Sequence, residues 1–146
     1  MKIHHLHFSI NINSTPKAIW NALWNDQLYR KWASVFFEGS YMRCDEWKAG
    51  HTVFFLGPDQ SGIYSTIEAY VPNKTIRFKH IGKVKKGEKL AVDKETKLWS
   101  GSNEAYTILE GSEHHTLSVE IDVMDEHLEF MKGKFPEALG VIKSNC

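Results

Sequence analysis

The stretch EHLEFMKGKFPEALGVIK, residues 126–143, decides the fold of this chain. Its large apolar residues recur every three or four positions, which is the spacing of one helix face. This apolar stripe consists of Leu128, Met131, Phe135, Leu139 and Ile142. The pattern predicts a long amphipathic helix with one face to bury.

Three residues that disfavour helices, Gly133, Pro136 and Gly140, lie within the same stretch without shifting the phase of the stripe. Proline lacks a backbone N–H and crowds the carbonyl four residues before it, so a proline that does not end a helix bends it. We therefore expect one long helix kinked at Pro136. A bent apolar face requires a curved surface to cover.

Most of the preceding chain has the two-residue period of β-strands. Turn residues separate the strands, and the short links between them favour antiparallel pairing. The candidate strands read HHLHFSININ, YMRCDEW, HTVFFLG, GIYSTIEAYV, KTIRFKHIG, NEAYTILEG and HHTLSVEIDV.

Two short helices are predicted after the first strand, in STPKAIWNALWN and NDQLYRKWA. Thr15 is a suitable N-cap, and Pro16 sits at the first helical position, where its missing N–H does no harm. The lysine-rich residues 82–101 show little periodicity, and we expect a mobile loop or a long hairpin excursion there, either of which leaves room for a short helical turn.

The order of these elements predicts a single α+β domain over residues 1–146. An antiparallel sheet buries one face, and the C-terminal helix is the large apolar element available to cover it. We expect a helix-grip fold, in which a curved antiparallel sheet wraps around the long kinked C-terminal helix.

Several motifs resemble those of the START and birch-pollen-allergen superfamily, also called SRPBCC. The resemblance is nearest to the homologues of the heat-shock-protein ATPase activator. It rests on the motifs STPKAIWNALWN, EWKAGHTVFF, IEAYVPNKTIRFKH, WSGSNEAYTILE and KFPEALGVIK, in that order, with Phe135 where that family usually has tryptophan. The resemblance implies a cavity between sheet and helix that often holds an apolar ligand.

Composition narrows the range of functions. The 18 basic and 18 acidic residues cancel, which argues against a general nucleic-acid partner. No apolar run is long enough for a membrane span, no secretory signal is visible, and two cysteines do not make a disulfide framework. These features predict a cytoplasmic protein.

Aromatic side chains are the strongest functional signal, because binding pockets are mostly apolar with a few placed polar groups. They also suit an ordinary solid core, and the sequence leaves both interpretations open. Together with one histidine, the candidates for the cavity wall are Trp32, Trp47, Phe55, Tyr64, Phe78, His80, Trp99, Tyr106, Phe130 and Phe135.

Polar residues give weaker signals. His80 shares a strand face with Ile76 and Phe78, so it would be a polar group in an apolar wall, a core histidine or a rim residue. Strict alternation places Glu104 and Tyr106 on one face of their strand. It likewise places Glu68 on the same face as Tyr64 and Tyr70, but it does not say which face of either strand is buried.

No catalytic, metal-binding or cofactor-binding motif is evident. His5 and His7 share a face but lack further ligands at a defined spacing, and no nucleophile elbow or phosphate-binding glycine loop occurs. We expect no metal and no cofactor.

Three functions remain open. The first is a binding protein for an apolar or amphipathic small molecule, and the second is a co-chaperone-like module with a protein partner. The third is a cyclase- or hydrolase-type enzyme, which needs two polar groups converging in the cavity. The sequence identifies no such pair.

Overall fold

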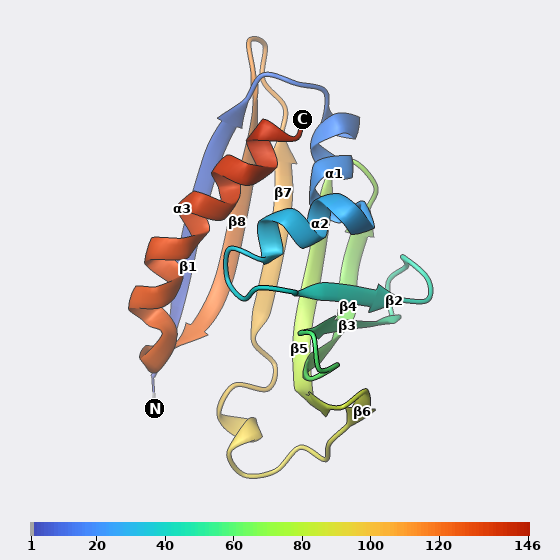
Figure 1. Ribbon diagram of the computed structural model, residues 1–146. Helices are drawn as coiled ribbons and strands as arrows, with labels where there is room; N and C mark the ends of the chain where they lie inside the picture. Colours follow the sequence, from blue (N-terminus) through green and yellow to red (C-terminus); the bar gives the residue numbers. More distant parts are fainter. Residues whose placement is uncertain (1) are drawn as a thin grey trace.

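Three α-helices cover one face of an antiparallel β-sheet in the computed structural model, which describes residues 2–146 (Figure 1). The elements are β1 (Ile3–Ile12), α1 (Pro16–Trp24), α2 (Asp26–Ala33), β2 (Tyr41–Cys44), β3 (Thr52–Leu56), β4 (Gly62–Val71), β5 (Thr75–Lys85), β6 (Glu88–Lys89), β7 (Asn103–Leu109), β8 (His115–Met124) and α3 (Leu128–Ser144). Short 3-10 turns span Thr96–Leu98 and Asp125–His127. The predicted α+β helix-grip class is confirmed.

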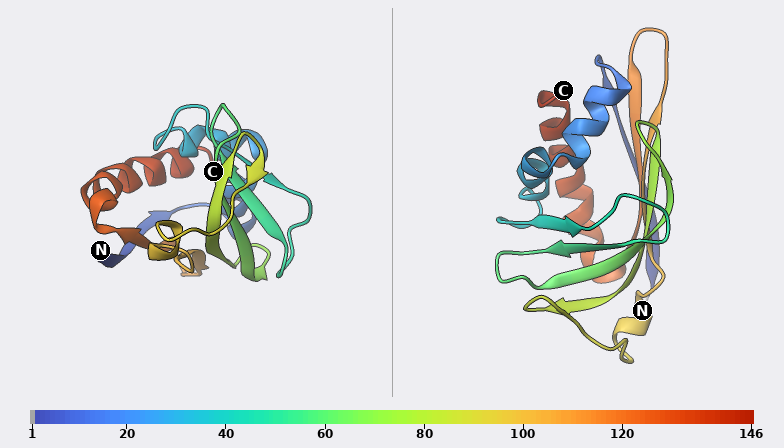
Figure 2. Two further views of the ribbon diagram at one scale, coloured as in Figure 1. Left: turned by 90° about the horizontal axis from the view of Figure 1, so that it is seen from below. Right: turned by 90° about the vertical axis from the view of Figure 1, so that its right-hand side faces the viewer.

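The sheet has eight strands in the order β1-β8-β7-β5-β4-β3-β2, with β6 paired to β5. The first and last strands of the chain are neighbours, in a register that runs from Ile3 opposite Met124 to Ile12 opposite His115. Figure 2 shows the sheet curling so that β2 and β3 project toward the side on which the helices lie.

The first helix starts as predicted. The Thr15 hydroxyl accepts a hydrogen bond from the Ala18 N–H over 3.0 Å, and Pro16 occupies the first helical position. Since the first N–H groups of a helix lack partners within it, this cap fixes where α1 begins.

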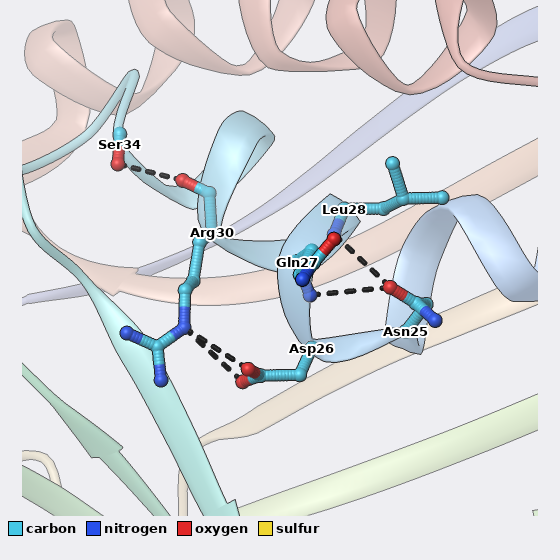
Figure 3. Close-up of polar contacts among 6 residues, drawn as sticks. All are labelled: Asn25, Asp26, Gln27, Leu28, Arg30 and Ser34. Atoms are coloured by element: carbon cyan, nitrogen blue, oxygen red, sulfur yellow. Dashed lines mark hydrogen bonds and ion pairs between the residues drawn. The ribbon is translucent and has the colours of Figure 1, made fainter.

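The second helix is held by side chains at both ends (Figure 3). The Asn25 side-chain carbonyl accepts hydrogen bonds from the Gln27 and Leu28 N–H groups. The Arg30 guanidinium lies 3.2 Å from Asp26, and the Ser34 hydroxyl donates to the Arg30 carbonyl over 2.6 Å. These local contacts orient α2 so that Trp32 points into the core, where its indole N–H donates to the Leu23 carbonyl.

Helix α3 runs from Leu128 to Ser144 without a break at Pro136. The predicted stripe faces the sheet: Phe135, Leu139 and Ile142 are buried, together with Ala138. Pro136 is exposed, so the chain tolerates it on the solvent side of the helix. The interpretation of residues 126–143 as one amphipathic helix is confirmed, apart from its first two residues, which belong to the preceding 3-10 turn.

Residues 82–101 form a hairpin followed by a short 3-10 turn, which is one of the two expected alternatives. β5 continues to Lys85 and forms a hairpin with β6, and Val84 is buried. The Asp93 carboxylate then accepts the N–H of Thr96, whose side chain is buried. The structure thus shows the hairpin alternative, with the predicted strand KTIRFKHIG continuing beyond residue 82 to Lys85.

Strict alternation also fails in β4, because the register against β5 shifts between Ile67 and Ala69. The extra residue is Glu68, which is exposed and lies 3.8 Å from the Lys79 ammonium. Beyond this bulge, Tyr70 packs against the core. Glu68 and Tyr70 therefore lie on opposite faces, contrary to the prediction.

Candidate functional site

Two adjoining pockets lie between α3 and the sheet, with volumes of about 560 and 530 Å³. We call them the α2 pocket, lined by Tyr29, Trp32 and Phe36 among others, and the β8 pocket, lined by Ile121, Val123 and Met124 among others. Five residues line both: Gly62, Ile63, Glu104, Met131 and Phe135. These shared residues form the boundary between the two adjoining pockets, which we together call the hollow.

Aromatic packing builds the wall where the two pockets meet. The Phe135 ring stacks on Phe8 of β1, with centroids 4.9 Å apart, and its side meets the Phe36 ring at 4.8 Å. Phe55 of β3 packs edge-on against Phe78 and against the His80 imidazole. Phe135 thus joins α3 to β1, while Phe55 joins β3 to β5 on the other side of the pockets.

A chain of polar side chains crosses this apolar wall from β4 to β7. The Ser65 hydroxyl lies 2.6 Å from His80 Nδ1, and His80 Nε2 lies 3.1 Å from Glu104 Oε1. The Tyr106 hydroxyl donates to the other Glu104 oxygen, Oε2. Of these four residues, Glu104 is the one that lines both pockets.

The hydrogen bonds define what each group donates. Burial, and then the nearby charge of Glu104, raise the pKa of Tyr106 well above its usual value, so its phenol keeps the proton that it donates. Glu104 as a carboxylate only accepts, so His80 Nε2 carries the hydrogen toward it. In the tautomer that carries its hydrogen on Nε2, His80 Nδ1 accepts from the Ser65 hydroxyl.

Seven of the ten candidate residues line the hollow. Trp32, Phe55 and Tyr106 line the α2 pocket, whereas His80, Trp99 and Phe130 line the β8 pocket. Phe135 borders both.

The other three candidates line neither pocket. Phe78 is fully buried in the core, and Trp47 packs against Trp24 and Tyr70. Tyr64 lies opposite Gly82 in the β4–β5 register, with the Lys89 ammonium 4.9 Å from the centre of its ring. Its strand neighbour Ser65 points inward, so Tyr64 points away from the hollow.

Sequence reasoning missed the convergence of His80 and Glu104. Alternation along each strand places His80 on the same inward face as Phe78, and Glu104 on the same inward face as Tyr106. Their contact also depends on the register between β5 and β7, in which Phe78 is paired with Glu104. The usable signal was a carboxylate that extends the apolar face of NEAYTIL. Ser65, Met131 and Ile63 were also missed, and ordinary core residues carry no signal that separates them from pocket residues.

The other candidate sites have structural partners. His5 Nδ1 lies 2.9 Å from Asp122, and this hydrogen bond raises the His5 pKa. His7 lies 2.8 Å from the Ser118 hydroxyl. Within residues 2–146 no three histidine, cysteine or acidic residues are grouped to hold a metal ion. No helix in that range is both long and apolar enough to span a membrane.

No protein-family model and no curated protein matches the chain. Solved structures do match it over most of its length. Protein MLL2253 from Mesorhizobium loti is 14% identical, with a TM-score of 0.71 over 97% of this chain and 95% of that one. The Aha1 dimer from Colwellia psychrerythraea is 17% identical, with a TM-score of 0.63 over 97% and 92%.

DynU16, a protein of the dynemicin biosynthetic locus, is 10% identical, with a TM-score of 0.65 over 96% of this chain. The match covers 46% of DynU16, so this chain spans about half of that protein. At such low identities these likenesses show the fold alone. They agree with the helix-grip architecture described above.

Proposed function

We propose that this protein binds an apolar or amphipathic small molecule in the hollow between α3 and the sheet. The observation that carries the proposal is the placement of Glu104, a hydrogen-bonded carboxylate in an apolar wall that borders both pockets. Binding sites for small molecules combine apolar walls with a few fixed polar groups of this kind.

A titration with an apolar fluorescent dye tests this proposal. We expect saturable binding, with dye emission enhanced and Trp32 or Trp99 emission altered, because both tryptophans line the hollow. Ile63→Trp should fill the junction of the two pockets and abolish binding, while Val71→Trp, on an exposed strand end, is the matched control. Equal dye binding by the wild type and both variants would place the dye elsewhere and refute the proposal.

An acid–base enzyme is the second candidate, favoured by the contact between His80 and Glu104 within the β8 pocket. Glu104 could remove a proton beside a ketone carbonyl, and the enolate would then take a deuteron from D₂O. The test is deuterium incorporation into 2-tetralone, followed by NMR. Exchange that is accelerated by the wild type and lost in Glu104→Gln would favour this candidate, and exchange at the buffer rate would exclude it for this substrate.

Ester hydrolysis through Ser65 is not supported, although Ser65, His80 and Glu104 form a serine–histidine–acid sequence of contacts. The Ser65 hydroxyl is fully buried and lines neither pocket, so a substrate carbonyl cannot reach it. A nucleophile must be within reach of its substrate. Ser65 instead positions the imidazole.

We also propose that the chain is a divergent relative of the heat-shock-protein ATPase activator homologues, with a protein partner as its alternative function. The ordered sequence motifs and the full-length likeness to Aha1 support this relationship. Phe37 and Phe130, which are 64% and 46% exposed, are the two aromatic residues among the exposed large apolar side chains and are available for a protein contact. Stimulation of a heat-shock ATPase that is lost in Phe37→Ser or Phe130→Ser would establish this alternative, and no stimulation would count against it.

A further inference from the structure

We infer that the molecule bound in the hollow presents a hydrogen-bond donor to Glu104, and that a protonated amine meets this requirement best. This inference rests on the proposed binding function and specifies the chemistry of the ligand's polar end. The hydrogen-bonding capacity of four connected residues, Ser65, His80, Glu104 and Tyr106, sets this requirement.

The hydrogen-bond donors of these four residues are already engaged with one another. The His80 Nε2–H and the Tyr106 hydroxyl both donate to Glu104, and the Ser65 hydroxyl faces His80 Nδ1. A ligand that needs a donor from these four residues, such as a carboxylate or a ketone, would have to break one of these bonds. The existing network therefore disfavours acceptor-only ligands.

Glu104, in contrast, keeps capacity to accept. Each carboxylate oxygen has two lone-pair sites, and each Glu104 oxygen receives one hydrogen bond from the protein. The side chain retains 23% of its exposure and borders both pockets. A donor placed in either pocket can reach it without disturbing His80 or Tyr106.

The charges around the hollow favour the same kind of ligand. Its lining includes three carboxylates, Asp59, Glu104 and Asp122, against one lysine, Lys83. The Lys83 ammonium lies 3.7 Å from Glu95, which offsets its charge. Burial works against ionisation of Asp122, but hydrogen bonds from His5 and the Asn103 N–H outweigh it and lower the Asp122 pKa. Even with Asp122 paired to His5 over 2.9 Å, Asp59 and Glu104 remain, so an anionic ligand would meet net repulsion.

Three probes with the same apolar body and different polar ends test the inference: 2-naphthylmethylamine, 2-naphthalenemethanol and 2-naphthoate. Calorimetry at neutral pH measures their dissociation constants with the wild type. A charge-assisted hydrogen bond predicts that the amine binds roughly ten- to hundredfold more tightly than the carboxylate. The alcohol, which donates without a charge, should fall between them.

Glu104→Gln identifies the group responsible, because it removes the charge with little change of shape. We expect the preference for the amine over the carboxylate to shrink at least tenfold. Glu68→Gln is the matched control, since it removes one carboxylate from β4 outside the hollow and should leave the preference unchanged. The wild-type ranking tests the inference even if Glu104→Gln fails to fold.

Failure of the inference can be distinguished from failure of the proposed function. If the carboxylate binds as tightly as the amine, the inference is wrong while the binding function stands. If the preference for the amine survives Glu104→Gln, or weakens equally in Glu68→Gln, Glu104 is not its source and the inference is also wrong. If none of the probes binds, the proposed function and the inference fail together.

Discussion

The two halves of α3 meet the sheet differently. In the C-terminal half, Ala138, Leu139 and Ile142 are at most 2% exposed and pack on the same side of the sheet as α1 and α2 (Figure 1). In the N-terminal half, Leu128 and Met131 are only partly buried and Phe130 is 46% exposed. We call these regions the closed end and the open end of the interface.

The two ends differ in how completely the side chains of the neighbouring elements fill the space between α3 and the sheet. At the closed end, α1 supplies Ile19, Trp20 and Leu23 to the same core as α3. At the open end, α2 lines the α2 pocket with Tyr29 and Trp32 but does not fill it, and the two pockets remain. One amphipathic helix can therefore serve as core packing along one half and as a pocket wall along the other.

The largest contrast should appear when the two ends are truncated in the same way. Leu139→Ala, at the closed end, should lower the free energy of unfolding by about 3–5 kcal/mol, because it leaves a cavity in tight packing. Met131→Ala, at the open end, should cost roughly 1 kcal/mol, because its side chain already borders empty space. Urea denaturation measures both, and equal losses would remove the distinction between the ends.

Phe135 lies at the boundary and should show both behaviours. Its ring is 3% exposed and stacked on Phe8, yet it borders both pockets. Phe135→Ala should therefore cost about 3 kcal/mol, the lower limit for a buried ring, and should also change the affinity for an apolar dye. A loss of stability with unaltered dye binding would assign Phe135 to the closed end alone.

Ser65→Ala should separate support of the pocket from contact with the ligand. It leaves His80 Nδ1 without its partner in a buried site, at an expected cost of about 1–3 kcal/mol. Because Ser65 lines neither pocket, dye affinity should stay within about twofold of wild type, close to the precision of the comparison. Thermal unfolding and a dye titration on the same samples provide the check.

The smallest effect should be the same at both ends. Gly133 and Gly140 lie on the exposed side of α3, and a Cβ added at either would meet no atom within 4 Å. Gly133→Ala and Gly140→Ala should each stabilise the protein by about 0.5–1 kcal/mol, through helix propensity alone. If Gly133→Ala is destabilising while Gly140→Ala is not, the open end requires flexibility that its packing does not reveal.

The sequence predicted the closed end better than the open end. The stripe through Phe135, Leu139 and Ile142 follows from a period along one element, which is a local property. The same holds for Thr15 as the cap of α1, and for the inward phase of β8. Burial of one face of a helix or strand gives a periodic pattern of apolar residues in the sequence.

The hydrogen-bonded series of Ser65, His80, Glu104 and Tyr106 at the open end gives no such periodic pattern. Ser65 faces His80 because the β4–β5 register shifts between Tyr64 and Ser65, and His80 on β5 reaches Glu104 on the neighbouring β7. Register across three strands depends on bulges and turns that composition does not specify. The sequence predicts which residues share a strand face, but which of them contact one another depends on the strand register in the folded sheet.

An NMR titration of the labelled protein with 2-naphthylmethylamine tests the central claim most directly, because it locates binding along α3. We predict saturable shifts of the backbone amide signals of Ile63, Glu104 and Met131, which belong to residues that line both pockets. The signals of Leu139 and Ile142, in the closed end, should stay in place. Shifts confined to the closed end or to the outer face of the sheet, or no saturable shifts at all, would contradict the account.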